Sequence, residues 1–197
     1  FLVVRCSPIF EYSQVALNLV TIVGMITAIF AASVALVQND IKKIVAYSTC
    51  SQLGYMFFAA GVGAYHVAMF HLFTHAFFKA LLFLGAGSVI HAFKNEQDIR
   101  NMGGVRKKLP FTYFFMLIGT LALTGFPFLS GFYSKDAIIE FSYLKNSSLG
   151  NYAASIGILT AFLTSIYSWR LFFKTFHGTY NNKKISINET HESPIVM

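Results

Sequence analysis

The sequence has little charge: only 12% of its 197 residues are Asp, Glu, Lys or Arg, about half of the roughly 25% that is typical of a soluble domain. Residues 12–39, 44–78, 109–134 and 146–169 contain no charged residue at all. The shortest of these stretches has 24 residues, whereas a helix needs roughly 20 to cross a bilayer core ~30 Å thick. The scarcity of charge therefore excludes a soluble globular domain and predicts a polytopic membrane protein.

Cysteine is equally scarce. The two cysteines, Cys6 and Cys50, lie in different apolar segments and form neither a disulfide framework nor a metal-binding spacing. The net charge is +7, but long apolar stretches interrupt the basic residues, so they form no continuous phosphate-tracking face and we expect no nucleic-acid partner. The chain opens on apolar residues without an initiator methionine or a signal peptide, so we expect an internal fragment of a longer protein.

Apolar stretches bounded by charged residues or helix breakers predict an all-α fold, a polytopic transmembrane helical bundle with one discontinuous helix. We expect one transmembrane domain fragment over residues 1–178 and a polar tail over residues 179–197. The five expected spans are residues 15–37, 44–62, 65–93, 110–144 and 152–173.

Basic residues collect on one side of the predicted bundle. Alternating the spans across the membrane leaves Arg5 and Lys145 on one side, and the residues that gather on the other side are Lys42, Lys43, Lys94, Arg100, Arg106, Lys107, Lys108, Arg170, Lys174, Lys183 and Lys184. By the positive-inside rule this second group marks the cytoplasmic or matrix face. Lys79 and Lys135 remain inside the third and fourth spans, where ionisable groups are costly and usually face a bundle interior or a water-filled path.

The third span carries three titratable residues at a spacing of four: His71, His75 and Lys79. On a helix this spacing places successive side chains ~40° apart and ~6 Å along the axis, so they form one stripe ~12 Å long. Histidine has an unperturbed pKa of ~6.5, so both of its protonation states are accessible and a proton could pass along the stripe with a few intervening waters. One alternative is that these polar residues only hydrogen-bond between packed helices. Another is a metal ion, for which this helix offers no Asp, Glu or Cys nearby, or a haem, whose opposite faces two histidines on the same side of one helix cannot both bind.

The fourth span is too long for one straight helix, because its 35 residues would extend ~52 Å against a core of ~30 Å. Pro127 lies between Gly125 and Gly131 and predicts a break in the helix, and Lys135 and Asp136 follow directly. An ionisable residue beside broken backbone in a membrane is typical of an ion or proton site. The alternatives are a kink that only shapes packing, with Lys135 reaching the outer interface, and an Asp136 that pairs with Lys135 or a neighbouring subunit or lies at the outer surface.

Three runs of the sequence resemble the antiporter-like subunits of respiratory complex I, the NADH:quinone oxidoreductase. They are residues 37–56 (VQNDIKKIVAYSTCSQLGYM), 71–83 (HLFTHAFFKALLF) and 131–136 (GFYSKD). A fourth run, residues 87–104, resembles the chain 5 or subunit L type within that family. The resemblance covers nearly the whole chain up to Gly178, and the tail beyond it diverges.

The resemblance implies a proton-translocating membrane subunit that couples NADH-to-quinone electron transfer in other subunits to proton pumping. It places His71, His75 and Lys79 on a central hydrophilic axis and makes Lys135 the terminal lysine on the broken helix, facing the outer half-channel. We predict Asp136, next to Lys135, as a further residue of the proton pathway. The glutamate and lysine pair that the family carries on earlier helices has no counterpart here, so this segment cannot pump by itself.

The same resemblance implies that NADH, FMN, iron–sulfur clusters and quinone belong to other subunits, with no cofactor, no metal and no complete active site in this chain. The expected partners are other membrane-arm subunits, the lipid bilayer and protons, in a bacterial or mitochondrial inner membrane that the chain crosses several times. Two alternatives stay open: a subunit of a multisubunit Na+/H+ antiporter, and a structural membrane subunit without a transport role.

Overall fold

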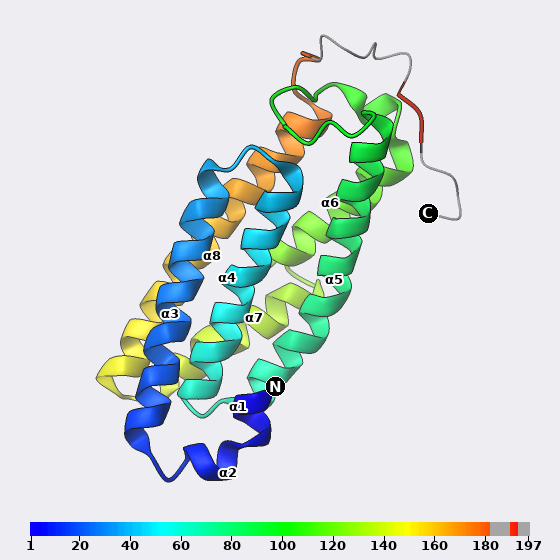
Figure 1. Ribbon diagram of the computed structural model, residues 1–197. Helices are drawn as coiled ribbons and strands as arrows, with labels where there is room; N and C mark the ends of the chain where they lie inside the picture. The colour runs from blue at the N-terminus through cyan, green and yellow to red at the C-terminus, as the bar shows by residue number, and fades with distance from the viewer. Residues whose placement is uncertain (182–189, 193–197) are drawn as a thin grey trace.

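The computed structural model describes residues 1–181 and 190–192, and it confirms the all-α prediction for them (Figure 1). Within those residues the only strand-like pairing is an isolated bridge between Asp40 and Asp98. The elements are the short helices α1 (Leu2–Arg5) and α2 (Ser7–Phe10), the long helices α3 (Gln14–Val37), α4 (Ile41–Gly61) and α5 (Tyr65–Ala92), the turn η1 (Val105–Lys107), the half-length helices α6 (Pro110–Thr124) and α7 (Ser130–Leu144), and the long helix α8 (Ser148–Phe176).

Four of the five expected spans coincide with α3, α4, α5 and α8 to within a few residues at each end, and the remaining one, residues 110–144, divides into α6 and α7. Three of these helices, α3, α5 and α8, are long and apolar enough to cross a membrane. Helices α6 and α7 have 15 residues each and are ~22 Å long, so neither alone covers a core of ~30 Å. The assignment of five crossings, and of residues 1–178 as one domain, stays a prediction.

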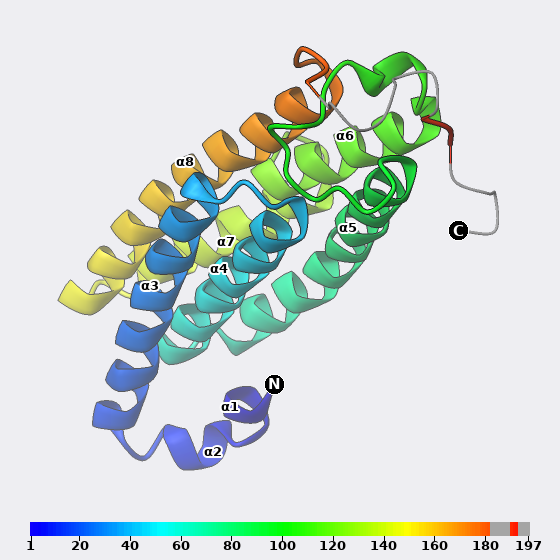
Figure 2. The same ribbon diagram turned by 45° about the horizontal axis from the view of Figure 1, so that its top comes forward.

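The long helices form two layers. Helices α3, α4 and α5 lie side by side, and α8, α7 and α6 lie behind them (Figures 1 and 2). The α3–α4 connector, the loop between α5 and α6, and the end of α8 meet at one end of the bundle, which carries the described members of the large basic group. Arg5 and Lys145 lie toward the other end, as the charge pattern predicts, whereas Lys183 and Lys184 lie outside the described residues.

Helices α3 and α4 pack backbone against backbone because their facing residues are small. A Cβ added at Gly54 would lie 2.6 Å from the backbone nitrogen of Ala28 and 2.7 Å from the carbonyl oxygen of Gly24. The Ser51 hydroxyl donates to the Ala28 carbonyl at 2.8 Å. Small residues permit such close approach in membrane helices, where packing rather than the hydrophobic effect drives association. The contact places α4 deep in the bundle, so its Ser48 and Gln52 are buried.

The break between α6 and α7 follows from the local sequence. Helix α6 ends with Gly125 in the left-handed region, at φ +80°, where the Gly125 amide bonds to Ala122 and the Phe126 amide to Leu121. These two bonds form a Schellman motif, for which glycine is the favoured residue. Pro127 lacks an amide hydrogen and cannot continue the helix. The chain therefore turns, and α7 begins against the last turn of α6.

Arg170 joins α8 to the connector between α3 and α4. Its Nη1 donates to the carbonyls of Leu36 at 2.8 Å and Gln38 at 2.7 Å, and its Nη2 donates to Asn39 Oδ1 at 2.6 Å. Carbonyls in the last turn of a helix lack intrahelical donors, and a cation there also interacts favourably with the helix dipole. The sequence pattern assigned Arg170 only to the basic face, but in the fold it also fixes one end of the bundle.

Candidate functional site

The three residues of the predicted stripe all lie inside the bundle, on the face of α5 that meets the other helices. The exposed fractions are 0% for His71, 5% for His75 and 4% for Lys79. The imidazole centroids of His71 and His75 are 5.9 Å apart. Because the three positions are four residues apart on one helix, a single buried face carries all of them. The exposed side of α5 carries phenylalanines instead.

His71 is held from both sides by residues of other helices. Its Nδ1 lies 2.9 Å from the hydroxyl of Ser134 on α7, and its Nε2 lies 3.2 Å from Oε1 of Gln52 on α4. The Thr74 hydroxyl also lies within hydrogen-bond distance of Ser134, at 3.0 Å. This cluster links α4, α5 and α7 at the interface between the two layers.

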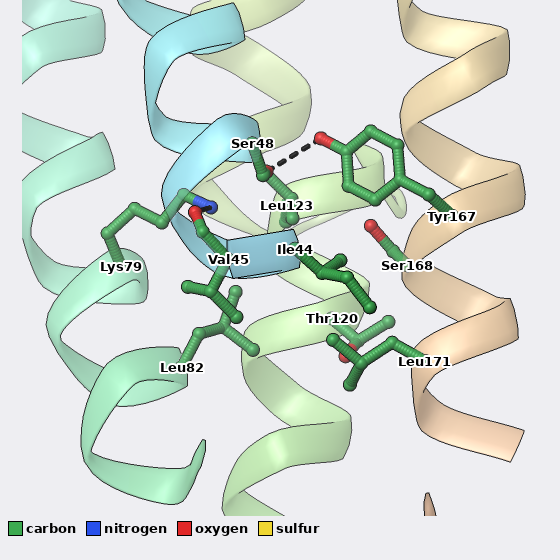
Figure 3. Close-up of a pocket in the computed structure, with 10 residues that line it drawn as sticks. All are labelled: Ile44, Val45, Ser48, Lys79, Leu82, Thr120, Leu123, Tyr167, Ser168 and Leu171. Atoms are coloured by element: carbon green, nitrogen blue, oxygen red, sulfur yellow. Dashed lines mark hydrogen bonds between the residues drawn. The ribbon is translucent and has the colours of Figure 1, made fainter. Parts of the chain in front are cut away.

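Lys79 lies beside a small cavity between α4, α5, α6 and α8 (Figure 3). Its Nζ donates to the Val45 carbonyl at 3.2 Å, and across the cavity the Tyr167 hydroxyl donates to Ser48 Oγ at 2.6 Å. About 20 Å³ of the cavity is open to the centres of water molecules, which is enough for roughly one or two waters. The buried Ser168 hydroxyl lines the same cavity and has no hydrogen-bond partner among the described residues.

Lys135 lies near the start of α7, beside the break that separates it from α6. Its side chain is 3% exposed, and its Nζ donates to the Leu123 carbonyl of α6 at 2.7 Å. The Schellman motif satisfies the carbonyls of Leu121 and Ala122 and leaves that of Leu123 for this contact. The ammonium group also lies 5.8 Å from the centre of the Tyr55 ring, which is within cation–π range. The C-terminal end of a helix carries partial negative charge, which favours a cation in this place.

The last turn of α6 connects the two buried lysines. Leu123 lines the cavity beside Lys79, and its carbonyl oxygen binds Lys135. Within residues 1–181 and 190–192 no carboxylate lies within ion-pair distance of either ammonium group. Each lysine instead donates to a backbone carbonyl, a partner that can accept a hydrogen bond but cannot take the proton.

Asp136, the last predicted pathway residue, does not share the buried position of the other four. Its side chain is exposed on the outer face of α7, as is that of Glu140 one turn later. No hydrogen bond or ion pair is found between Asp136 and Lys135, so of the places considered for Asp136 the fold favours the outer surface. Its part in a proton pathway stays a prediction.

Sequence reasoning missed the residues that surround His71. Ser134 directly precedes Lys135 in the sequence, and Gln52 lies in α4, a helix that carries none of the predicted site residues. Thr74 follows His71 by three residues, which puts both on one helical face and was a usable signal. Nothing in the spacing indicates that Ser134 and His71, 63 positions apart, bind each other.

The sequence analysis also considers whether histidines of this chain hold a metal ion. Across the described ranges, no group of three or more His, Cys, Asp or Glu side chains is arranged to hold a metal ion.

The sequence is similar to a family of membrane transport subunits. Residues 1–168 match the family described as "NADH:quinone oxidoreductase/Mrp antiporter, TM". The chain belongs to this family.

Two individual relatives are similar to this chain over its whole length. The chain is 56% identical over 197 residues to NADH-ubiquinone oxidoreductase chain 5 of Marchantia polymorpha, covering 100% of this chain and 29% of that protein. It is 57% identical over 208 residues to NADH-quinone oxidoreductase subunit L of Rhodobacter capsulatus, covering 100% and 29%. The chain thus spans less than a third of the length of these relatives.

A solved structure shares the fold. A chain in the "Structure of Mrp complex from Dietzia sp. DQ12-45-1b" superimposes with a TM-score of 0.80, at 22% identity, over 87% of this chain and 32% of that chain. At this identity the likeness shows the fold of the family, a polytopic transmembrane helical bundle. The membrane class predicted from the scarcity of charge is confirmed, and the resemblance to complex I antiporter-like subunits is confirmed with it.

Proposed function

We propose that this chain is part of a proton-translocating membrane subunit of NADH:quinone oxidoreductase, and that His71, His75, Lys79 and Lys135 carry the proton. The observation that carries the proposal is the pair of buried lysines inside the bundle, Lys79 and Lys135, neither with a carboxylate partner among the described residues. A buried, unpaired ammonium group is costly. Such a cost is retained where the group has a function, and gaining or losing a proton is what these groups can do.

The stripe and the helix break take different parts in this mechanism. His71, His75 and Lys79 exchange a proton along α5, with water in the cavity beside Lys79 as an intermediate carrier. The last turn of α6 stabilises the ammonium form of Lys135 through the Leu123 carbonyl and the helix dipole. Because the backbone is broken beside Lys135, small movements of α7 against α6 alter that contact without unwinding a continuous helix.

Electron transfer belongs to other parts of the assembly. The chain 5 and subunit L relatives are named as NADH oxidoreductase subunits, so we assign NADH, FMN, iron–sulfur clusters and quinone to partner subunits. The partners of this chain are then the other membrane-arm subunits and the lipids of a bacterial or mitochondrial inner membrane. Its oxidoreductase activity is that of the complex, and its own contribution is proton movement.

The test replaces each buried lysine in the full-length chain within its intact complex. Lys79→Ala and Lys135→Ala are expected to lower the protons moved per NADH oxidised. Lys145→Ala is the matched control, because Lys145 Nζ also donates to a carbonyl at a helix end, that of Val62 at 2.6 Å, but its side chain is exposed. Normal NADH-driven pumping in both Lys79→Ala and Lys135→Ala would refute the proposal.

Asp136 needs its own pair of variants. If Asp136 acts in the pathway, Asp136→Asn lowers the protons moved per NADH, whereas Glu140→Gln, on the same exposed face of α7, leaves the ratio unchanged. Equal effects of the two variants would remove Asp136 from the pathway and leave Lys135 as its last residue in this chain.

A second candidate is a subunit of a multisubunit Na+/H+ antiporter, which the fold likeness to a chain of the Mrp complex favours. Purification of the complex discriminates between the two, because only the first predicts NADH-oxidising subunits bound to the same assembly. A purely structural subunit predicts a third result: the lysine variants change the stability of the complex and leave ion transport intact.

A further inference from the structure

The hydroxyl of Ser134 lies at the meeting point of two helices. It donates to the Ser130 carbonyl in its own helix at 3.0 Å, accepts from the Thr74 hydroxyl at 3.0 Å, and lies 2.9 Å from Nδ1 of His71. Ser134 and His71 are both 0% exposed. Bulk water therefore cannot replace any of these contacts.

The Ser134 hydroxyl can serve as a hydrogen-bond partner of Nδ1 whether or not that nitrogen carries a proton. A serine hydroxyl has one proton and two lone pairs, and it can rotate. When Nδ1 of His71 carries a proton, it donates to Ser134, and Ser134 donates to Ser130. When Nδ1 is bare, the Ser134 hydroxyl can turn and donate to it. Nδ1 thus has a hydrogen-bond partner in either state.

Gln52 does the same for the other ring nitrogen. Its Oε1 faces Nε2 of His71 at 3.2 Å and accepts when Nε2 carries a proton. Its amino group is buried without a partner among the described residues, so a turn of the amide would present a donor to a bare Nε2. The doubly protonated imidazolium is satisfied on both sides in the orientation seen.

We propose that Ser134 is a positioning residue for proton transfer, because its rotating hydroxyl, together with the amide of Gln52, gives every protonation form of His71 a complete set of hydrogen bonds. The inference rests on the proposed function of His71 in proton movement. Ser134 also ties the stripe on α5 to α7, the helix that carries Lys135 at the next position. The proton balance is closed between the two histidines: Ser134 and Gln52 keep their own protons, and the proton that His71 loses is the one that His75 gains, with the two ring centroids 5.9 Å apart.

A second serine on α7 provides a matched control. Ser142 is also 0% exposed, and its hydroxyl donates to the carbonyl four residues earlier, that of Ile138 at 2.7 Å. Among the described residues, no hydrogen bond joins Ser142 to a histidine. Replacing either serine by alanine removes the same kind of bond within α7, so only Ser134→Ala also removes the partner of Nδ1.

The experiment uses the full-length chain in its intact complex and measures assembled complex, NADH oxidation and protons moved per NADH. Leaving a buried nitrogen without a partner disfavours the forms that need it by roughly tenfold or more, so Ser134→Ala is expected to slow pumping by about tenfold relative to Ser142→Ala and to raise the solvent deuterium isotope effect. Ser134→Thr, which keeps the hydroxyl, is expected to restore both. Equal pumping and equal isotope effects in Ser134→Ala and Ser142→Ala would overturn the inference.

Two further variants keep the test decisive. If Ser134→Ala fails to assemble, Gln52→Met removes the partner of Nε2 while keeping the side-chain length, and normal pumping in an assembled Gln52→Met complex overturns the inference equally. Lys135→Ala and Lys79→Ala are measured alongside. Normal pumping in both Lys135→Ala and Lys79→Ala would refute the proposed function itself, whereas loss in Lys135→Ala with normal pumping in Ser134→Ala would refute only the role of Ser134.

Discussion

Arg170 offers a quantitative prediction about how the bundle end is held. The change is Arg170→Met, which keeps much of the apolar stem and removes the guanidinium group. Three hydrogen bonds to the α3–α4 connector are lost, with lengths from 2.6 to 2.8 Å. The carbonyls of Leu36 and Gln38 are then left to water or to no donor. Helix α8 loses its main polar tie to that connector.

The size of the effect follows from the kind of bond. A hydrogen bond to a charged group contributes ~1.5–3 kcal/mol, and a cation at a helix C-terminus adds ~0.3–1 kcal/mol. Arg170 is only half-buried, so water replaces part of what is lost, and the bonds share one side chain and do not add fully. We expect a loss of ~2–4 kcal/mol in local stability, equivalent to roughly 30-fold to several-hundred-fold faster opening of the connector.

Hydrogen exchange measures this opening directly. In the purified complex, amides of residues 36–41 are expected to exchange faster in Arg170→Met by that factor. Lys174→Met is the control, because Lys174 is an exposed cation one turn later on α8. Unchanged exchange at residues 36–41 in Arg170→Met, or an equal effect of Lys174→Met, would refute the assigned role of the guanidinium group.

Three shorter predictions concern backbone and loop positions. Gly125→Ala places a side chain at φ +80° and is expected to destabilise the complex by ~1–2 kcal/mol in thermal unfolding. At Gly87, an added Cβ meets nothing within 4 Å, so Gly87→Ala is expected to stabilise the complex by up to ~1 kcal/mol. Gly54→Ala brings a Cβ to 2.6 Å from α3 backbone, and the forced separation of α3 and α4 is expected to cost ~1–3 kcal/mol in the same assay. Arg100 hydrogen-bonds Asp98 and lowers the pKa of its carboxyl below the ordinary value. The resulting stabilisation is present above the ordinary carboxyl pKa of about 4 and is lost as the pH falls through the lowered value. The protection of residues 96–101 against hydrogen exchange, relative to the intrinsic exchange rate at each pH, is therefore expected to fall there, and protection that does not change with pH would contradict this.

Much of the fold could be predicted because membrane proteins obey simple length and charge rules. Uncharged stretches longer than a bilayer crossing indicate helices, and glycines around Pro127 indicate a break. The uneven distribution of basic residues predicts which connectors lie together at each end of the bundle. These signals are local in sequence, or depend only on composition, so they need no knowledge of which helices touch.

The contacts of the site could not be predicted in the same way. The spacing of His71, His75 and Lys79 predicts a shared face, but not that Gln52 and Ser134 reach that face from two other helices. The contact of Lys135 with the Leu123 carbonyl depends on how α7 folds back against α6. Asp136 is charged and adjacent to Lys135, so the sequence predicts it in the proton pathway, yet its position on α7 places its side chain on the exposed face. Such features arise from tertiary packing, which a single sequence does not encode locally.

The central claim is that the two buried lysines move protons. The most direct test is the number of protons translocated per NADH oxidised by the intact complex when Lys79 or Lys135 is replaced by methionine, which keeps the side-chain length and removes the ammonium group. The account predicts that each variant assembles and that each moves fewer protons per NADH than the matched Lys145→Met complex. Assembled Lys79→Met and Lys135→Met complexes that both keep the unaltered ratio would contradict it.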